Sequence, residues 1–241
     1  DPNRQIRWSA SARGSNAQHV MLIVYSISWE RGGRKIALGL STGSVQVWSI
    51  DGLPVSPHRR SKSKAGAPRG RTKPRGKLCS GGKGVPSLHK GPVFCVDWSP
   101  FEHVWYSEDG AGESHAAQGT EYGGLIASSS GDRCVVLSTA NGHVVCVERL
   151  PNTVFGCHWN RLRPGALATA CADGKIRIYH LKRDRGNGRR GGNSGGSGDR
   201  DGTRKFSGAS LSLAACLSGH SKSTFRAVWS PHSSTLLASS S

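Results

Sequence analysis

Four segments of this chain of 241 residues share an aromatic residue followed four positions later by tryptophan, with similar residues after the pair. Such a recurrence marks an internal repeat, and a repeat constrains the architecture before any local propensity is weighed. The chain therefore consists of several copies of one small unit. The pairs are Tyr25 and Trp29, Phe94 and Trp98, Phe155 and Trp159, and Phe225 and Trp229.

The similarity between the copies extends beyond the two aromatic residues. Each tryptophan is followed by a polar turn and then by a run of apolar and tiny residues, at 36–39, 126–129, 167–170 and 237–240. From the tryptophan to the alanine of the run the separations are 8, 29, 9 and 9 residues, so the second copy contains an insertion. In the first three copies a turn and an alternating segment follow, at 44–48, 134–137 and 175–179.

A spacing of four residues also suits one face of a helix, so the helical interpretation has to be compared with a strand. The segments are short, are bounded by Gly, Pro, Asn and Asp, and are rich in β-branched residues. Val45 and Val47, like Ile176 and Ile178, alternate with polar residues at a period of two, which is typical of a strand. We therefore predict four short strands in each unit.

The turn residues Asp132 and Asp173 are 41 residues apart, which gives the length of one unit. Four strands in about 40 residues resemble a blade of a WD-repeat β-propeller, a small twisted sheet that stacks on its neighbours. The positions that carry this resemblance are Trp29, Trp48, His89, Trp98, Asp132, Trp159, Asp173, Tyr179, His220 and Trp229. The Trp-Asp pair of the family is absent from every copy, since Ser49 follows Trp48 and His180 follows Tyr179.

The resemblance predicts an all-β fold, a partial WD-repeat β-propeller of about three and a half four-stranded blades with long disordered basic insertions. Short pairing strands are expected near 85–88 and 212–217. Rings of this type hold 4–8 blades, so we expect the chain to be a piece of a longer protein. Residues 1–241 are divided into blade 1 at about 18–52 with insertion 53–84, blade 2 at about 85–150 with insertion 101–124, blade 3 at about 151–219 with insertion 183–207, and a truncated blade 4 at 220–241.

The positions of the insertions within the blades indicate which face of the disc is open. In a four-stranded antiparallel blade the first-to-second and third-to-fourth turns lie at one end, and the remaining turns lie at the other. The insertion at 101–124 falls in a first-to-second turn and the two basic insertions fall in third-to-fourth turns. All three are therefore expected on one face, and the opposite face is expected to be short-looped and accessible.

The net charge of +18 is concentrated in two segments. Residues 53–90 contain eleven basic residues and no acidic one, and residues 182–205 contain eight basic and three acidic residues, so the blades are nearly neutral. Both segments are low in large apolar residues, a composition that predicts disorder. A polyanion such as nucleic acid would contact the first segment by releasing counterions, whereas the simpler interpretation is a solvated insertion without a partner. The candidate contacts are Arg59, Arg60, Lys62, Lys64, Arg69, Arg71, Lys73 and Arg75.

Cysteine content and hydropathy bear on the compartment. The seven cysteines are odd in number, form no Cys-x-x-Cys pair and fall mostly in predicted strands, where cysteine behaves as a small apolar residue. No apolar stretch approaches the ~20 residues that a spanning helix needs. We therefore predict a soluble intracellular protein without a membrane span, with the cytoplasm preferred over the nucleus.

The histidines and serines form no recognisable catalytic or ligand pattern, and the Gly-rich segment 191–198 lacks the Gly-Lys-Ser/Thr ending of a phosphate loop. We predict no enzymatic activity, no cofactor, no metal and no small-molecule substrate. The main hypothesis is a protein-interaction scaffold whose partners are other proteins or peptides bound at the short-looped face. Two alternatives remain: a nucleic-acid-associated propeller that uses its basic insertions, and purely structural blades of a longer propeller.

Overall fold

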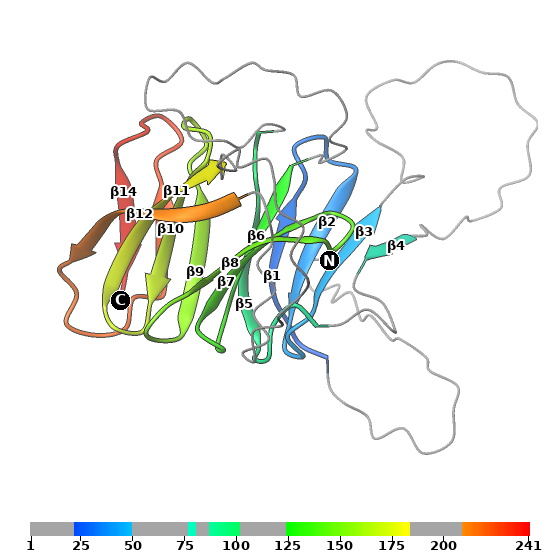
Figure 1. Cartoon of the computed structure of the whole chain (residues 1–241), viewed down its shortest axis with the longest axis horizontal. Helices are drawn as coiled ribbons and strands as arrows, with labels where there is room; N and C mark the ends of the chain where they lie inside the picture. Colours follow the sequence, from blue (N-terminus) through cyan, green and yellow to red (C-terminus); the bar gives the residue numbers. More distant parts are fainter. Residues whose placement is uncertain (1–21, 50–76, 81–86, 102–123, 184–208) are drawn as a thin grey trace, which may run out of the picture.

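A computed structural model of the chain describes residues 22–49, 77–80, 87–101, 124–183 and 209–241. These ranges form strands and turns and contain no helix, so none of them holds a helix long and apolar enough to cross a membrane. Three four-stranded sheets and one two-stranded sheet follow one another along the chain (Figure 1). This arrangement confirms the predicted all-β fold of about three and a half blades.

Each four-stranded sheet is antiparallel, and its strands are hydrogen-bonded in sequence order. The first sheet holds β1 (Val24–Trp29), β2 (Lys35–Leu40), β3 (Val45–Ser49) and β4 (Lys77–Ser80). The second holds β5 (Val93–Trp98), β6 (Leu125–Ser130), β7 (Cys134–Thr139) and β8 (Val144–Arg149). The third holds β9 (Val154–Trp159), β10 (Ala166–Cys171), β11 (Lys175–Arg183) and β12 (Ala209–Ser218), and the last holds β13 (Arg226–Trp229) and β14 (Leu237–Ser240).

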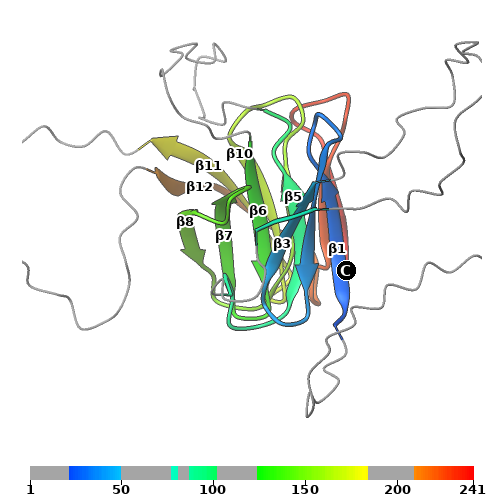
Figure 2. The same ribbon diagram turned by 90° about the vertical axis from the view of Figure 1, so that its right-hand side faces the viewer.

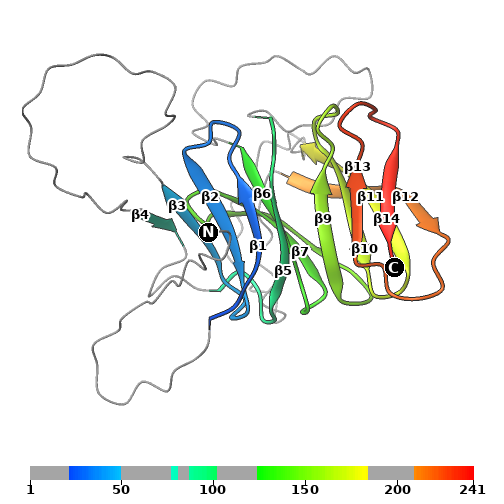
Figure 3. The same cartoon turned by 180° about the vertical axis from the view of Figure 1, so that it is seen from behind.

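The first strands of the four sheets lie side by side, with the later strands of each sheet behind them. Figure 3 shows β1, β5, β9 and β13 next to one another. In the perpendicular view the outer strands β8 and β12 lie on one side of the molecule and β1 and β5 on the other (Figure 2). The aromatic-x-x-x-Trp segments therefore form the innermost strands, as the WD-repeat resemblance implies.

The runs of small residues form the second strands, and their size lets neighbouring sheets approach closely. A Cβ added at Gly39 on β2 would lie 2.9 Å from Val93 Cγ1 on β5. Ala127 on β6 and Ala168 on β10 are fully buried. Larger side chains at these positions would hold the sheets apart, because protein interiors are close-packed. The alanine and glycine content of the runs is thus explained by the stacking of sheets.

The turns between second and third strands require an unusual backbone conformation. Gly43 and Gly174 have φ of 83° and 75°, the left-handed region that glycine adopts without steric cost. They also lie against the connection that leads into the following sheet: a Cβ added at Gly174 would lie 2.7 Å from the carbonyl oxygen of His220. In the second sheet Arg133 takes up this conformation with φ of 70°.

The hydrophobic core lies between successive sheets and is divided into three clusters. Between the first and second sheets, Val47 packs with Val96 and Trp98. Between the second and third sheets, Leu137 packs with Cys157 and Trp159. Between the third and last sheets the cluster contains Ala168, Ala170, Ile176, Ala227 and Trp229. Each sheet is therefore stabilised mainly by burying a face against its neighbour.

The outward face of the first sheet has no such cover among the described residues. Trp29 is 55% exposed and Ile27 is 59% exposed, whereas Trp98 at the equivalent position of the second sheet is 1% exposed. In the last sheet, at the other end of the series of sheets, Val228 is 42% exposed. The same sequence position is thus buried or exposed according to whether another sheet packs on it.

The predicted position of the fourth strand of the first sheet was wrong. The fourth strand of the first sheet is Lys77–Ser80, paired through Trp48 with Leu78, rather than a strand near 85–88; Ser87 and Leu88 lie outside any strand. The other pairing strand, predicted near 212–217, lies within β12. Residues 50–76, 81–86, 102–123 and 184–208, which make up most of the three insertions, lie outside the described residues. The disorder predicted for the two basic insertions therefore stays a prediction.

Candidate interaction surface

The aromatic residue of each repeat lies at the beginning of an innermost strand. In the first three sheets the strand pairing skips this residue: Val93 pairs with Ser130 and Cys95 with Ser129, which leaves Phe94 without a partner across the strand. The same shift occurs at Tyr25 and Phe155. An extra residue of this kind is a β-bulge, which redirects a side chain out of the regular alternation. Phe225 directly precedes β13.

The four aromatic side chains form one continuous row across all four sheets. The ring centroids are 5.4 Å apart between Tyr25 and Phe94, 5.3 Å between Phe94 and Phe155, and 5.0 Å between Phe155 and Phe225. These spacings and the tilted or edge-on orientations are favourable for aromatic pairs. Tyr25 is 46% exposed and Phe225 is 53% exposed, and the two central rings are half-buried. We call Tyr25, Phe94, Phe155 and Phe225 the aromatic row.

The aromatic row lies at the end of the sheets that has the short second-to-third turns. An equivalent backbone hydrogen bond lies beside three members of the row. In each case an N–H of the second-to-third turn donates to the carbonyl oxygen two positions before the aromatic residue. Ser41 N donates to Ile23 O at 2.9 Å, Gly131 N to Pro92 O at 3.0 Å, and Ala172 N to Thr153 O at 2.9 Å. Trp98 and Leu125, which approach 102–123 from either side, lie at the other end of β5 and β6.

His89 and Asp132, which the sequence analysis selected, lie together beside this end of the second sheet. His89 Nδ1 is 3.2 Å from each Asp132 carboxylate oxygen, and His89 Nε2 is 2.9 Å from Ser128 Oγ. The backbone N–H of Lys90 donates to Asp132 Oδ2 at 2.9 Å. Burial alone would raise the pKa of Asp132, but the hydrogen bonds from His89 and Lys90 hold it below its usual value. The hydrogen bonds of His89 and Lys90 to Asp132 therefore hold the connection into β5 against the β6–β7 turn.

Asp173 occupies the place of Asp132 in the third copy and has a different partner. His220 occupies the place of His89 in the last copy and contacts the equivalent serine of the second strand. Arg177 Nη2 donates to Asp173 Oδ2 at 2.6 Å, and this hydrogen bond lowers the pKa of Asp173 despite partial burial. His220 Nε2 is 2.8 Å from Ser239 Oγ on β14, so its observed partner is a strand residue rather than a turn residue.

The remaining aromatic positions differ in burial. Tyr179 is buried, and burial raises its pKa to about 12. Trp48 is half-buried, and its Nε1 donates to Gln46 Oε1 at 3.1 Å. Trp98, Trp159 and Trp229 are buried, in contrast to Trp29.

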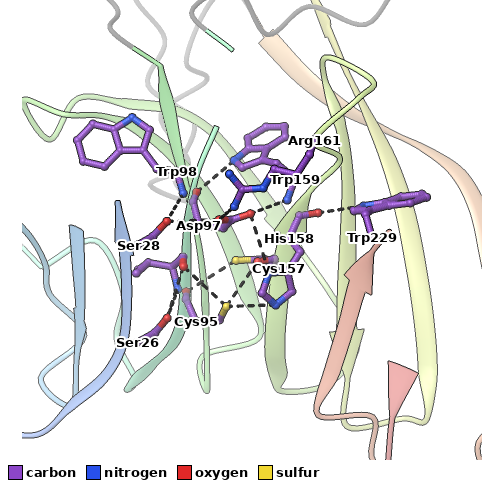
Figure 4. A network of polar contacts seen from close by, with 11 residues as sticks. Ser26, Ser28, Cys95, Asp97, Trp98, Cys157, His158, Trp159, Arg161 and Trp229 are labelled. Carbon is purple, nitrogen blue, oxygen red and sulfur yellow. Dashed lines mark hydrogen bonds and ion pairs between the residues drawn. The ribbon is translucent and has the colours of Figure 1, made fainter. Parts of the chain in front are cut away.

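A polar network, which the sequence analysis did not identify, joins each innermost strand to the next (Figure 4). The residue before the tryptophan of one copy accepts a hydrogen bond from the tryptophan backbone of the following copy. Trp98 N donates to Ser28 Oγ at 2.9 Å, and Trp159 N donates to Asp97 Oδ2 at 2.8 Å. The available sequence signal is the polar character of the residue before the tryptophan, which is Ser28, Asp97 and His158 in three of the four copies.

Indole groups add a second set of links in the same network. Trp159 Nε1 donates to Asp97 O at 3.2 Å, and Trp229 Nε1 donates to His158 O at 3.2 Å. Arg161 Nη2 donates to Asp97 Oδ1 at 2.9 Å. Burial raises the pKa of Asp97, and the charge of Arg161 opposes that shift. Asp97 therefore connects polar groups of both neighbouring copies: Ser28 of the first copy, and Trp159 and Arg161 of the third.

Two other expectations concern charged and metal-binding groups. The eight basic residues selected as polyanion contacts, between Arg59 and Arg75, lie outside the described residues. Among the described residues, no cluster of three or more His, Cys, Asp and Glu side chains could hold a metal ion. The predicted absence of cofactor, metal and catalytic group stays a prediction.

No protein-family model matches the chain. Among solved structures, a chain in the crystal structure of the mitotic checkpoint complex is similar over 90% of this chain and 45% of its own length, with a TM-score of 0.51 and 14% identity. Sqt1 from Saccharomyces cerevisiae aligns over 85% of this chain and 38% of its own, with a TM-score of 0.49 and 10% identity. This chain thus spans less than half of each matched chain. Together with the sheet order, the first similarity supports the fold of a partial WD-repeat β-propeller.

Proposed function

We propose that this chain is a non-catalytic protein-interaction scaffold that binds a peptide or protein segment along its aromatic row. The observation that carries the proposal is the continuity of the row: four rings in mutual contact, the two outer ones about half exposed, at the short-looped end of the sheets. Exposed apolar residues that are contiguous mark interaction sites, whereas single exposed residues are ordinary. Aromatic side chains also dominate the binding energy of protein interfaces.

The rigidity of the row supports recognition of a preformed shape. Each bulge is held by two flanking strand pairs, and the turn beside it is fixed by a backbone hydrogen bond. A side chain that is already ordered loses little entropy on binding, so more of the contact energy contributes to affinity.

The ring geometry supports a protein partner over single-stranded nucleic acid. Bases bind aromatic platforms by stacking on open ring faces. Here successive centroids are 5.0–5.4 Å apart and the planes are inclined at 45–65°, so neighbouring rings contact each other and leave no gap for a base to insert between them. The row presents ring edges and a continuous apolar surface, which suits aliphatic or aromatic side chains of a peptide.

A peptide selection tests the proposal directly. Peptides selected from a displayed random library against the intact chain should bind with an affinity that Phe94→Ala combined with Phe155→Ala weakens at least about thirtyfold, the factor for ~2 kcal/mol of lost hot-spot energy. Val147→Ala and Leu213→Ala, which truncate exposed residues on the outer strands β8 and β12, are the matched controls and should leave affinity unchanged. Equal binding by all variants would overturn the proposal.

Two further comparisons separate the alternatives. Deletion of residues 53–76, which keeps β4, should preserve peptide binding, because the basic insertion is not part of the row. If no peptide binds, and an oligouridine titration at low salt saturates for the intact chain but not for the deletion variant, the nucleic-acid alternative replaces this one. If no selected peptide binds better to the native chain than to a urea-unfolded sample, the blades act as structural elements.

We also propose that the chain forms part of a larger WD-repeat protein. Segments 24–29 and 93–98, and segment 154–159 with 168–173, resemble consecutive blades of WD repeat-containing protein seventeen. The exposure of Trp29 and Ile27 on the outward face of the first sheet supports an additional blade there. Limited proteolysis and gel filtration of the natural full-length protein would test this, because a compact fragment larger than 241 residues is expected.

A further inference from the structure

Two cysteines face each other across the interface between the second and third sheets. The Cys95 thiol on β5 donates to the carbonyl oxygen of Cys157 at 3.4 Å, and the Cys157 thiol on β9 donates to the carbonyl oxygen of Cys95 at 3.7 Å. Both residues are at most 2% exposed. The contact is reciprocal, so each sulfur lies beside the backbone of the other residue (Figure 4).

The pair occupies a position that recurs at the other two interfaces with different residues. Between the first and second sheets, Ser26 Oγ accepts from Val96 N at 3.1 Å at the equivalent place. Between the third and last sheets, Gly156 and Ala227 fill it, and a Cβ added at Gly156 would lie 3.1 Å from Phe225 O. The fold therefore accepts several residue types here, and the thiol pair is a property of this interface.

A histidine lies between the thiol pair and a carboxylate. His158 Nε2 is 3.8 Å from Cys95 Sγ, and His158 Nδ1 is 3.9 Å from Asp97 Oδ2. The neighbouring Cys157 side chain, and then His158, hold the pKa of Cys95 below its usual value against the effect of burial. Burial would lower the pKa of His158, but Cys95 and Asp97 raise it against the charge of Arg226. Burial raises the pKa of Cys157, which stays a thiol.

We propose that Cys95 is a peroxide-reactive thiol and that Cys157 resolves its oxidised form, so that this interface is a site of reversible disulfide formation. The class of oxidant is a small hydroperoxide, with hydrogen peroxide as the simplest member. The His158 side chain is 17% exposed, so the cluster adjoins solvent at the innermost strands although both sulfurs are buried. The proposal does not depend on the binding function of the aromatic row.

The chemistry balances with the groups present. The Cys95 thiolate sulfur attacks one peroxide oxygen, the O–O bond breaks, and the departing hydroxide leaves as water after taking a proton from the His158 imidazolium, giving a sulfenic acid at Cys95. The Cys157 sulfur then attacks the Cys95 sulfur, the S–O bond breaks, and the second hydroxide leaves as water with the Cys157 proton. Two thiols are oxidised by two electrons in total, and one peroxide is reduced to two water molecules.

Cys134 and Cys171 differ from Cys95 in the direction of their pKa shifts. Burial raises the pKa of Cys134, and the nearby Asp132 carboxylate adds to the shift. Burial also raises the pKa of Cys171. A raised thiol pKa lowers the thiolate fraction, which is the reactive species. Cys216 is exposed on β12 and serves as an internal comparison for reaction governed by access alone.

Peptide mass spectrometry of the intact, reduced chain after treatment with hydrogen peroxide tests the proposal. A disulfide between the Cys95 and Cys157 peptides should form before Cys216 is oxidised and should disappear with dithiothreitol. Cys157→Ser should leave a sulfenic acid at Cys95 that dimedone traps, and Cys95→Ser should leave Cys157 unmodified. Cys134→Ser and Cys146→Ser are the matched controls and should not change the outcome.

The role of His158 has its own readout. His158→Gln should slow disulfide formation by about tenfold near neutral pH, because one unit of thiol pKa changes the thiolate fraction tenfold. It should also move the rate profile to higher pH, which loss of packing alone would not do. If Cys216 is oxidised first, or if the Cys95–Cys157 disulfide forms in urea but not in the folded wild-type chain, the proposal is wrong. The wild-type comparison stands even if a variant fails to fold.

Discussion

The backbone N–H of Trp159 donates a 2.8 Å hydrogen bond to the Asp97 carboxylate, which links the innermost strands of two successive sheets. Asp97 lies directly before Trp98, and Trp159 occupies in β9 the place that Trp98 occupies in β5. The repeat thus provides both partners of the bond from adjacent copies. The Trp159 indole reaches the Asp97 carbonyl as well, so one side chain and one backbone group hold the same tryptophan.

Loss of the Asp97 carboxylate should destabilise the stack of sheets. Asp97→Ala leaves the buried Trp159 N–H without an acceptor, which costs about 1–3 kcal/mol of unfolding free energy. Asp97→Asn keeps one acceptor oxygen and should lose less. Urea unfolding followed by tryptophan fluorescence measures both, with Glu148→Gln on β8, a partly exposed carboxylate, as the control. A loss for Asp97→Ala no larger than that of the control would contradict this interpretation.

The stability of the chain should fall as the solution is acidified, in part because of Asp132. Its folded-state pKa lies below the unfolded value of about 3.9. A carboxyl of this kind stabilises the fold above the unfolded pKa, and the contribution is lost as the pH falls toward the folded pKa. Asp132→Asn should therefore lower stability at pH 7 and flatten its decline between about pH 5 and pH 2. If the unfolding free energy falls equally with pH in the wild type and in Asp132→Asn, the His89–Asp132 contact does not stabilise the fold.

Gly174→Ala should be clearly destabilising. The left-handed φ of 75° costs a non-glycine residue about 1–2 kcal/mol, and the added Cβ would lie 2.7 Å from His220 O. Gly219→Ala is the matched control, because no atom lies within 4 Å of its added Cβ. Denaturant midpoints of the two variants give the comparison, and equal midpoints would show that the β10–β11 turn does not need glycine.

Tryptophan truncation should have very different effects at equivalent positions. Trp159→Ala removes a buried side chain and should cost about 3–5 kcal/mol, whereas Trp29→Ala removes one that is 55% exposed and should cost much less. Thermal unfolding measures both. In addition, acrylamide should quench Trp29 more strongly than the buried Trp98, Trp159 and Trp229, which is detected as a smaller quenchable fraction in Trp29→Phe.

The sequence was sufficient to predict the innermost and second strands because their signals repeat four times. It misplaced β4, since Lys77–Ser80 offers too few residues for an alternating pattern and its register depends on Trp48 across the sheet. The aromatic residues were recognised as strand markers, but their assembly into a row depends on bulges that arise only when two strands pair. Cys95 and Cys157 are 62 positions apart, and only the stacking of the second and third sheets brings them together.

The tryptophan links between copies differ in their acceptor groups along the arc of sheets. Where Ser28 and Asp97 provide a side-chain oxygen in the first two copies, the third presents His158, whose carbonyl accepts the Trp229 indole. In a linear array, stability is the sum of each unit and its junctions with its neighbours. Amide exchange is therefore expected to be graded by junction, slowest in β5 and β9 and fastest in β13 and β14, so that opening begins at the last sheet while the middle of the array remains closed.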